Sequence, residues 1–302
     1  MSMRKSATLP IFTIMHPLVD ALSASVLWIG ADGIMSFVAY NFFAFALQLP
    51  FGIILDRWPQ ALKESFVVGM ALLVGGGVLA LCCIATLPVI CVCCIGNALF
   101  HLTAGKVIMD CSEGRSGPVA CFISTGALGL LIGKLFAVSC TAILIPFLVV
   151  VLIVGCAMAI RVAPFTDIPP FRFHCIPAAN WCAMAALFVI VVGRGWIVLY
   201  NGAIGSAVSL MLIGALVSLA GQVTGGYLSE RIGWRPVVGA SIVGSLLLYL
   251  GVGFEAQIAW FAILFLAQSA TGPVLSLIYH STDGASGTSF GLNCLGLFVG
   301  TF

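Results

Sequence analysis

The sequence contains few charged residues for its length. Of its 302 residues, 12 are lysine or arginine and 10 are aspartate or glutamate, so charged residues make up 7% of the chain, against 62% that are hydrophobic. A soluble globular domain carries about 25% charged residues. A chain of this composition cannot cover a water-facing surface. The composition therefore excludes a soluble enzyme, a nucleic-acid-binding protein and a disordered regulator.

The motifs of nucleotide-driven transport and of cofactor centres are also missing. No Walker A sequence is present, and Gly75-Gly76-Gly77 lies inside an apolar run rather than in a phosphate-binding loop. Most of the 12 cysteines lie in apolar runs, and the only CxxC spacing, Cys91 to Cys94, has no second pair and no histidine at ligand spacing. We therefore expect no cofactor and no metal site, and we interpret the cysteines as small apolar packing residues.

Long apolar runs fill most of the sequence. A helix needs about 20 apolar residues to cross a hydrocarbon core of about 30 Å. Because the runs are continuously apolar, without period-two alternation, they predict helices rather than barrel strands. The predicted fold class is an all-α membrane protein, a polytopic helical bundle. Its ten complete spans, followed by the start of an eleventh near Ser289, are Leu9–Ile29, Ile34–Leu55, Phe66–Ile84, Pro88–Val107, Gly117–Ala137, Val138–Ile160, Ala178–Tyr200, Ile204–Leu228, Pro236–Phe254 and Ile258–Leu277.

The basic residues gather on one side of this arrangement. Every second connection, starting with the N terminus, contains basic residues, and the opposite connections contain none. By the positive-inside rule, the N terminus is predicted to be cytoplasmic, in a protein of the cell membrane. The ten residues on this side are Arg4, Lys5, Arg57, Lys63, Lys106, Arg115, Arg161, Arg172, Arg231 and Arg235, and the remaining two, Lys134 and Arg194, fall inside spans.

A short pattern occurs twice, 174 residues apart. The second span ends with Gly52, Asp56 and Arg57, and the eighth ends with Gly226, Glu230 and Arg231 at the same spacing. The second copy continues through Gly233 to Arg235, whereas the first continues as Trp58-Pro59-Gln60. The only long proline-rich connection lies between the copies. It predicts an N-terminal half over residues 1–161, a cytoplasmic linker over 162–177, and a C-terminal half over 178–302, with the halves in parallel orientation.

With this repeated Gly-x-x-x-Asp/Glu-Arg signature the chain resembles the major facilitator superfamily of transporters. Shorter stretches resemble its fosmidomycin-resistance branch: His16-Pro-Leu-Val-Asp20, Phe100-His101 and Arg194-Gly-Trp. The resemblance implies two parallel-related six-helix halves, so that the sequence stops within the eleventh of twelve helices. It also implies that the signature residues Gly52, Asp56, Arg57, Gly226, Glu230, Arg231, Gly233 and Arg235 form a conformational latch.

Three ionisable residues in spans one and four are candidates for proton coupling or for lining the cavity. His16 and Asp20 are four residues apart and share a helix face, and His101 lies in the cytoplasmic half of the fourth span. An ionisable side chain in the membrane is costly and marks a site by default. Histidine titrates near neutral pH, which suits proton relay. The alternatives are a purely structural His16–Asp20 pair and a metal site, for which three ligands could be found but no spacing signature exists.

Arg194 and Lys134 are candidates for substrate binding. Two cations facing one cavity would predict an anionic or phosphorylated solute, since guanidinium binds such groups bidentately. Lys134 has the alternative of snorkelling to the interface. Neutral candidates for the cavity, with interhelical hydrogen bonding as the alternative, are Asn41, Gln48, Asn97, Gln222 and Gln268.

These features predict a secondary active transporter that moves a small organic, anionic solute by alternating access, with proton-coupled efflux as the leading mechanism. Its predicted partners are the lipid bilayer, the solute and protons, with no nucleic acid, and the chain is expected to be monomeric. A facilitator or uptake symporter of the same fold is one alternative. The alternative from another class is a non-transporting sensor or an intramembrane enzyme using His16, Asp20 and His101, although we expect no enzyme.

Overall fold

The computed structural model describes residues 3–30, 33–82, 86–137, 139–166, 171, 178–204, 207–253 and 256–302. Within these ranges every regular element is a helix, and ten spans are long and apolar enough to cross a membrane. The helices of the first half are α1 (Met3–Gly30), α2 (Ile34–Asn41), α3 (Gln48–Arg57), α4 (Leu62–Leu81), α5 (Leu87–Ser112), α6 (Ser116–Ser124), α7 (Gly126–Phe136) and α8 (Thr141–Val162). Those of the second half are α9 (Ala178–Ile204), α10 (Val208–Ile232), α11 (Trp234–Val252), α12 (Gln257–Ser269), α13 (Thr271–Ser281) and α14 (Ser286–Gly300).

Three spans are interrupted within the bundle. The second span contains a π-helical turn, η1 (Phe42–Ala46), between α2 and α3, and a 3₁₀ turn, η2 (Pro59–Ala61), follows α3. The fifth span breaks at Thr125, between α6 and α7, and the tenth breaks at Ala270, between α12 and α13. Because π-helical turns often occur at functional sites, the break in the second span marks a region where a site is expected.

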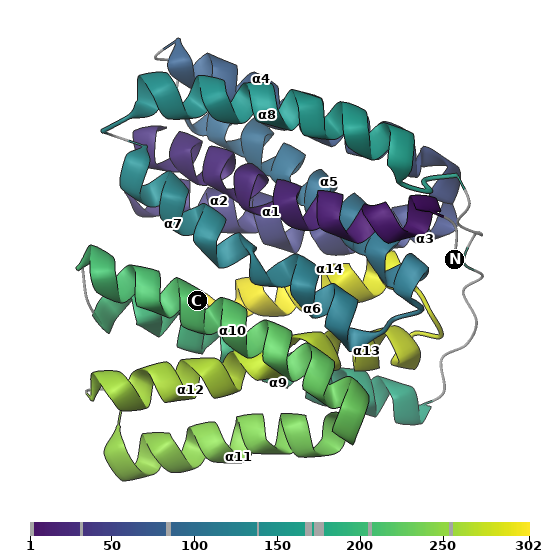
Figure 1. The fold of residues 1–302 in the computed structure, drawn as a ribbon, viewed down its shortest axis with the longest axis vertical. Helices are drawn as coiled ribbons and strands as arrows, with labels where there is room; N and C mark the ends of the chain where they lie inside the picture. The colour runs from purple at the N-terminus through teal and green to yellow at the C-terminus, as the bar shows by residue number, and fades with distance from the viewer. Residues whose placement is uncertain are drawn as a thin grey trace.

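The two halves lie side by side and meet along α14 and α6. In Figure 1 the purple-to-teal helices of the first half lie together, α9 to α13 form a second group, and the yellow α14 runs between them. α14 packs against α3 of the other half, and α10 packs against α6. α8 packs on α1 and α4, and α11 packs chiefly on α12. The charge-poor sixth and ninth spans therefore lie at the edge of the bundle, with side chains such as Ile143 and Leu250 more than 70% exposed.

The fourth span is longer than the sequence suggests. α5 extends to Ser112, five residues beyond the predicted end. Lys106, which we assigned to the cytoplasmic end of this span, lies inside the helix and is 2% exposed. Two carboxylates, those of Asp56 and Asp110, allow this lysine to stay within the packed helix. Most of the predicted linker, residues 167–170 and 172–177, lies outside the described residues.

Candidate functional site

Asp56, at the end of α3, joins the two halves. Its carboxylate accepts hydrogen bonds from the backbone N–H groups of Gly287 (2.9 Å) and Thr288 (2.7 Å), and from Thr288 Oγ1 (2.8 Å). Both residues belong to the first turn of α14, in the other half. A carboxylate at a helix N-terminus satisfies N–H groups that have no partner within the helix, and it complements the helix dipole. We call this cluster the Asp56 latch.

Lys106 supplies the countercharge of the Asp56 latch. Its Nζ lies 2.8 Å from Asp56 Oδ1, 2.8 Å from Ser286 Oγ and 3.2 Å from Asp110 Oδ2. Asp56 is fully buried. An unpaired carboxylate at such a position would be strongly destabilising, so the ammonium group is what allows Asp56 to be buried. The sequence alone did not reveal this role, although the i,i+4 spacing of Lys106 and Asp110 in a helical run was a signal for it.

Glu230 makes the equivalent contact from the second half. At the end of α10, its Oε1 accepts a hydrogen bond of 2.8 Å from the backbone N–H of Gly117, in the first turn of α6. The Ser116 hydroxyl donates to the Gly226 carbonyl oxygen at 3.0 Å and lies 2.7 Å from Ser229 Oγ. The second span of each half therefore places an acid on the N-terminus of the fifth span of the other half. We call this second cluster the Glu230 latch.

Glycines allow the helices to approach closely at both latches. A Cβ atom on Gly52 would lie 2.2 Å from the Gly287 carbonyl oxygen, and one on Gly226 would lie 2.5 Å from Ala120 Cβ. Backbones at this separation leave no space for a side chain, which is why small residues occur where membrane helices cross. The glycines of the repeated signature are therefore required by the same contacts that its acids make.

The other signature residues lie outside these contacts. Arg57 and Arg235 are exposed and stack over Trp58 (5.6 Å) and Trp234 (5.5 Å), their sequence neighbours. Arg231 is also exposed. Gly233 has a φ of +88°, and a Cβ atom there would meet no other atom within 4 Å, so its role is the turn between α10 and α11. The structure thus separates the acids and first glycines of the signature, which join the halves, from the arginines and Gly233.

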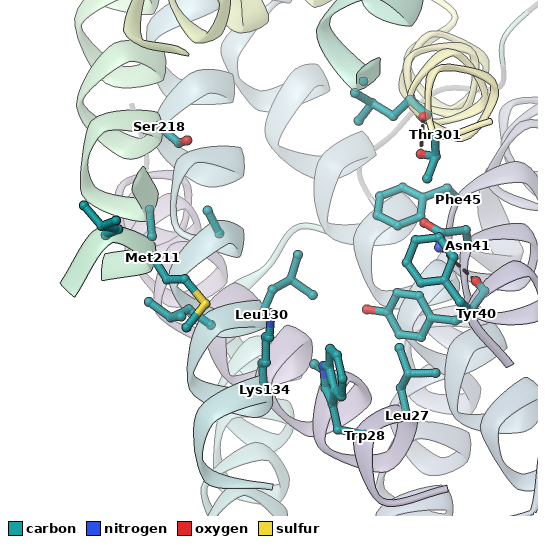
Figure 2. A pocket seen from close by; sticks show the side chains of 18 of the residues that line it. Leu27, Trp28, Tyr40, Asn41, Phe45, Leu130, Lys134, Met211, Ser218 and Thr301 are labelled. Carbon is teal, nitrogen blue, oxygen red and sulfur yellow. Dashed lines mark hydrogen bonds between the residues drawn. The ribbon is translucent and has the colours of Figure 1, made fainter. Parts of the chain in front are cut away.

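A cavity of about 420 Å³ lies between the halves at the opposite end of the bundle. Phe37, on its wall, precedes Asp56 by 19 residues in the same span, which corresponds to roughly 28 Å along a helix axis. Figure 2 shows Trp28, Tyr40 and Lys134 of the first half facing Met211 and Ser218 of the second half. The π-helical turn contributes Phe45 to the wall. The cavity is therefore built from both halves and from the broken second span.

Lys134 supplies the only charge among the described lining residues of this cavity. Its Nζ lies 5.2 Å from the centre of the Trp28 ring, within the range of a cation–π interaction. The remaining lining residues are apolar, aromatic or neutral polar. A pocket with mostly apolar walls and one fixed charge is typical of sites for small organic ligands. The arrangement suits an amphipathic anion.

The structure brings His16, Asp20 and His101 together. His16 Nε2 lies 3.2 Å from Asp20 Oδ2, and His101 Nε2 lies 3.3 Å from Asp20 Oδ1. Asn97 donates from Nδ2 to Asp20 Oδ1 at 3.1 Å and to Ser23 Oγ at 2.9 Å. The three ionisable residues are each less than 10% exposed. We call His16, Asp20 and His101 the triad.

A chain of hydroxyl and amide groups links the triad to the cavity. Tyr40, which lines the cavity, places its hydroxyl 3.4 Å from Ser23 Oγ, and Ser23 accepts the hydrogen bond from Asn97. Asn97 in turn holds Asp20. The triad is therefore one layer of side chains away from the cavity wall.

Arg194 does not face the same cavity as Lys134. It is 5% exposed and lines a second cavity of about 370 Å³ between α9, α11 and α12. Its Nε and Nη1 atoms have no hydrogen-bond partner among the described residues. Because Lys134 lines the inter-half cavity, the structure does not bring these two predicted substrate contacts together.

The neutral candidates are divided between the cavity and the packing of the helices. Asn41 lines the cavity and donates to the Phe37 carbonyl oxygen at 2.9 Å. Gln48 donates to the Ala44 carbonyl oxygen, and its Oε1 lies 3.2 Å from Cys294 Sγ of α14. Gln222 and Gln268 are bonded to each other, with 3.0 Å between Nε2 and Oε1. Of this set with Asn97, only Asn41 lies on the cavity wall.

No protein-family model matches the chain, and no curated protein matches it significantly. Solved structures do match. A variant of the E. coli fucose:proton symporter FucP superposes with a TM-score of 0.70 at 13% identity, covering 98% of this chain and 88% of that one. A second structure of FucP, described as a major facilitator superfamily transporter in the outward conformation, superposes with a TM-score of 0.67 at 14% identity and has the same coverage. A bacterial homologue of the iron transporter ferroportin, outward-facing and soaked with iron, gives 0.64 at 12% identity, covering all of this chain and 90% of that one.

These likenesses confirm the predicted fold class. The chain has the all-helical fold of the major facilitator transporters over nearly its whole length. At 12–14% identity the likeness concerns the fold alone. The narrower resemblance to the fosmidomycin-resistance branch stays a prediction.

Proposed function

We propose that the chain is a secondary active transporter that moves a small organic anion across the cell membrane by alternating access, as a monomer. The observation that carries this proposal is the cavity between the halves, which lies at the end opposite both latches. Rocking of parallel halves about a central site needs contacts that hold one end shut while the other end is open. The Asp56 and Glu230 latches are contacts of this kind, and the cavity is the open side.

The distribution of basic residues supports a cytoplasmic position for the latches and for the N terminus. Arg57, Lys63, Arg231 and Arg235 surround the latch end, as the positive-inside rule requires of a cytoplasmic face. In this orientation the cavity faces outward. The two matched structures whose conformation is named are also outward, which agrees with this assignment.

We assign proton coupling to the triad, with efflux as the direction of transport. The support is its position: three buried ionisable side chains lie beside the cavity and are connected to it through Tyr40, Ser23 and Asn97. One matched fold is that of a fucose:proton symporter, so the fold is compatible with proton coupling. Transport by the proteoliposome-reconstituted protein should respond to an imposed pH gradient, and Asp20→Asn should abolish that response.

The substrate proposal is tested by a thermal-stability screen of the purified protein against small organic anions. A ligand at 100 times its Kd stabilises the folded state by about 2.7 kcal/mol, which is a measurable shift in Tm. Anions that stabilise the wild-type protein should lose their effect in Lys134→Gln, whereas the exposed Arg161→Gln should respond like wild type. The hit is then used for counterflow in proteoliposomes. Stabilisation that persists in Lys134→Gln, or a hit that gives no counterflow, would contradict the proposal.

A further inference from the structure

We propose that the triad is a binding site for a first-row divalent transition metal ion, such as Zn²⁺, Fe²⁺ or Co²⁺. The inference rests on the proposed function only in placing the triad beside the transport cavity, and the metal ion would compete with protons for the same three side chains. It is carried by the orientation of the two imidazole rings, the spacing of the ligand atoms, the groups that surround them and the route that leads to them.

Backbone carbonyl groups fix the orientation of both rings. His16 Nδ1 lies 2.6 Å from the Phe122 carbonyl oxygen, and His101 Nδ1 lies 2.9 Å from the Asn97 carbonyl oxygen. A carbonyl oxygen only accepts hydrogen bonds, so each Nδ1 carries a hydrogen and donates it. In a neutral imidazole the other nitrogen, Nε2, is then an acceptor. Both Nε2 atoms point at Asp20.

This arrangement sets acceptors against acceptors. The carboxylate of Asp20 presents lone pairs to both Nε2 atoms, at 3.2 and 3.3 Å. One shared hydrogen would satisfy only one of these two contacts. A single cation between the three groups satisfies both at once, because each of them offers it a lone pair.

The spacing of the ligand atoms fits a transition metal ion. In a tetrahedral site with bonds of about 2.0–2.1 Å to nitrogen and oxygen, neighbouring ligand atoms are about 3.3 Å apart. His16 Nε2 lies at this distance from Asp20 Oδ2 (3.2 Å), and His101 Nε2 lies at this distance from the other oxygen, Oδ1 (3.3 Å). All three ligand atoms lie within 4.8 Å of one another.

The donor set and its surroundings select the class of metal. Two imidazole nitrogens and one carboxylate oxygen suit Zn²⁺ and Fe²⁺, whereas Mg²⁺ and Ca²⁺ prefer sites made of oxygen atoms. Histidines that bind metals almost always donate their second ring N–H to a carbonyl or carboxylate, as His16 and His101 do here. Asn97 Nδ2 holds Asp20 in the same way. The sequence predicts no metal because the ligands come from two helices, 81 residues apart, with no spacing signature.

The segment that packs on the triad also reaches the inter-half cavity. Gly126, at the break between α6 and α7, lies against the triad: a Cβ atom there would be 2.7 Å from Asp20 Oδ2 and 2.9 Å from His16 Nε2. Ala127, the next residue, lines the inter-half cavity. The triad is therefore adjacent in sequence to the cavity wall at Gly126–Ala127, and this segment is the route that we assign to the ion.

The test uses Co²⁺ as a spectroscopic probe on the purified protein in detergent micelles. Wild-type protein should bind one Co²⁺ with visible d–d absorption bands, which Zn²⁺ should displace. His16→Ala and His101→Ala should each remove the bands. Gly126→Ala keeps every ligand but fills the space beside them, and should weaken binding about tenfold or more, as expected when the support of a metal site is disturbed.

Two matched controls separate this result from general damage. Gly75→Ala adds the same methyl group where no atom lies within 4 Å, and His280→Ala removes an exposed histidine. Both should bind Co²⁺ like wild type, and Tm measurements should show all variants to be folded. The inference is overturned if the wild-type protein gives no d–d bands, or if the bands survive in folded His16→Ala. Binding at equilibrium needs no transport, so a metal-binding protein that fails in counterflow would refute the proposed function alone.

Discussion

Replacing Asp56 by asparagine should open the latch end of the bundle. Only the contacts that cross between the halves favour the latched state, because Lys106 belongs to the same half as Asp56 and stays beside it when the halves separate. The crossing contacts are those from Gly287 N–H, Thr288 N–H and Thr288 Oγ1. Asparagine keeps one oxygen acceptor but turns an NH₂ group toward the other donors.

The magnitude follows from these three contacts. A carboxylate at a partly buried helix N-terminus contributes up to about 2 kcal/mol through the helix dipole. A buried donor left without an acceptor costs about 1–3 kcal/mol. Together, the substitution should disfavour the latched state by about 2–4 kcal/mol, which is roughly a 30- to 900-fold change in the conformational equilibrium at 1.36 kcal/mol per factor of ten.

Electron–electron distance measurements check this prediction. Spin labels at Gln60 and Ile232, which are exposed at the latch end of opposite halves, are introduced into a cysteine-depleted background. Asp56→Asn should increase the population at long distance, and Arg57→Gln, which removes a neighbouring charge outside the latch, should not. The double variant Asp56→Asn/Glu230→Gln should increase the population at long distance further. A distance distribution in the double variant equal to that of wild type would refute the latch.

Two further substitutions test the packing and the charge of the same region. Gly52→Ala places a methyl group 2.2 Å from the Gly287 carbonyl oxygen, and it should favour the open latch by about 1–3 kcal/mol in the same distance measurement. Gly75→Ala, where no atom lies within 4 Å, is its control. Equal distance distributions for the two variants would contradict the close approach of the helices. Lys106→Met leaves the buried Asp56 and the half-buried Asp110 without their cation, at a cost of about 3–5 kcal/mol. It should lower the Tm well below that of the exposed Lys63→Met, and similar values for both would contradict a buried ion pair.

Much of the fold follows from features that are local in the sequence. An apolar run of about 20 residues without period-two alternation predicts a helical span wherever it occurs, because a helix satisfies its backbone groups within its own segment. The equal spacing of Gly52–Asp56 and Gly226–Glu230 singled out these residues, and both acids contact the other half. The shared face of His16 and Asp20 followed from helical periodicity.

The partners of these residues come from distant parts of the chain, and no local pattern identifies them. Asp56 contacts residues 231 and 232 positions away, on α14. The burial of Lys106 depends on the same crossing. Arg194 and Lys134 both lie inside apolar runs of the sequence, but they line different cavities. α9 packs chiefly on α14 and α13, and its Arg194 lines the space between α9, α11 and α12.

The sequence by itself determined that this is an all-helical membrane protein, and it marked which of the few charged residues are placed where charge is costly. The reason is solvation. The free energy of transfer from water to lipid depends on residue type and run length, so it favours the apolar spans and makes each charge within them costly. Only the tertiary structure decided that Asp20 lies between two imidazole rings with their Nδ1 atoms held by carbonyl groups, and that Asp56 and Glu230 contact the other half at the end opposite the cavity. These are properties of helix crossings, where glycines set the distance between backbones and the neighbours come from segments far apart in the chain.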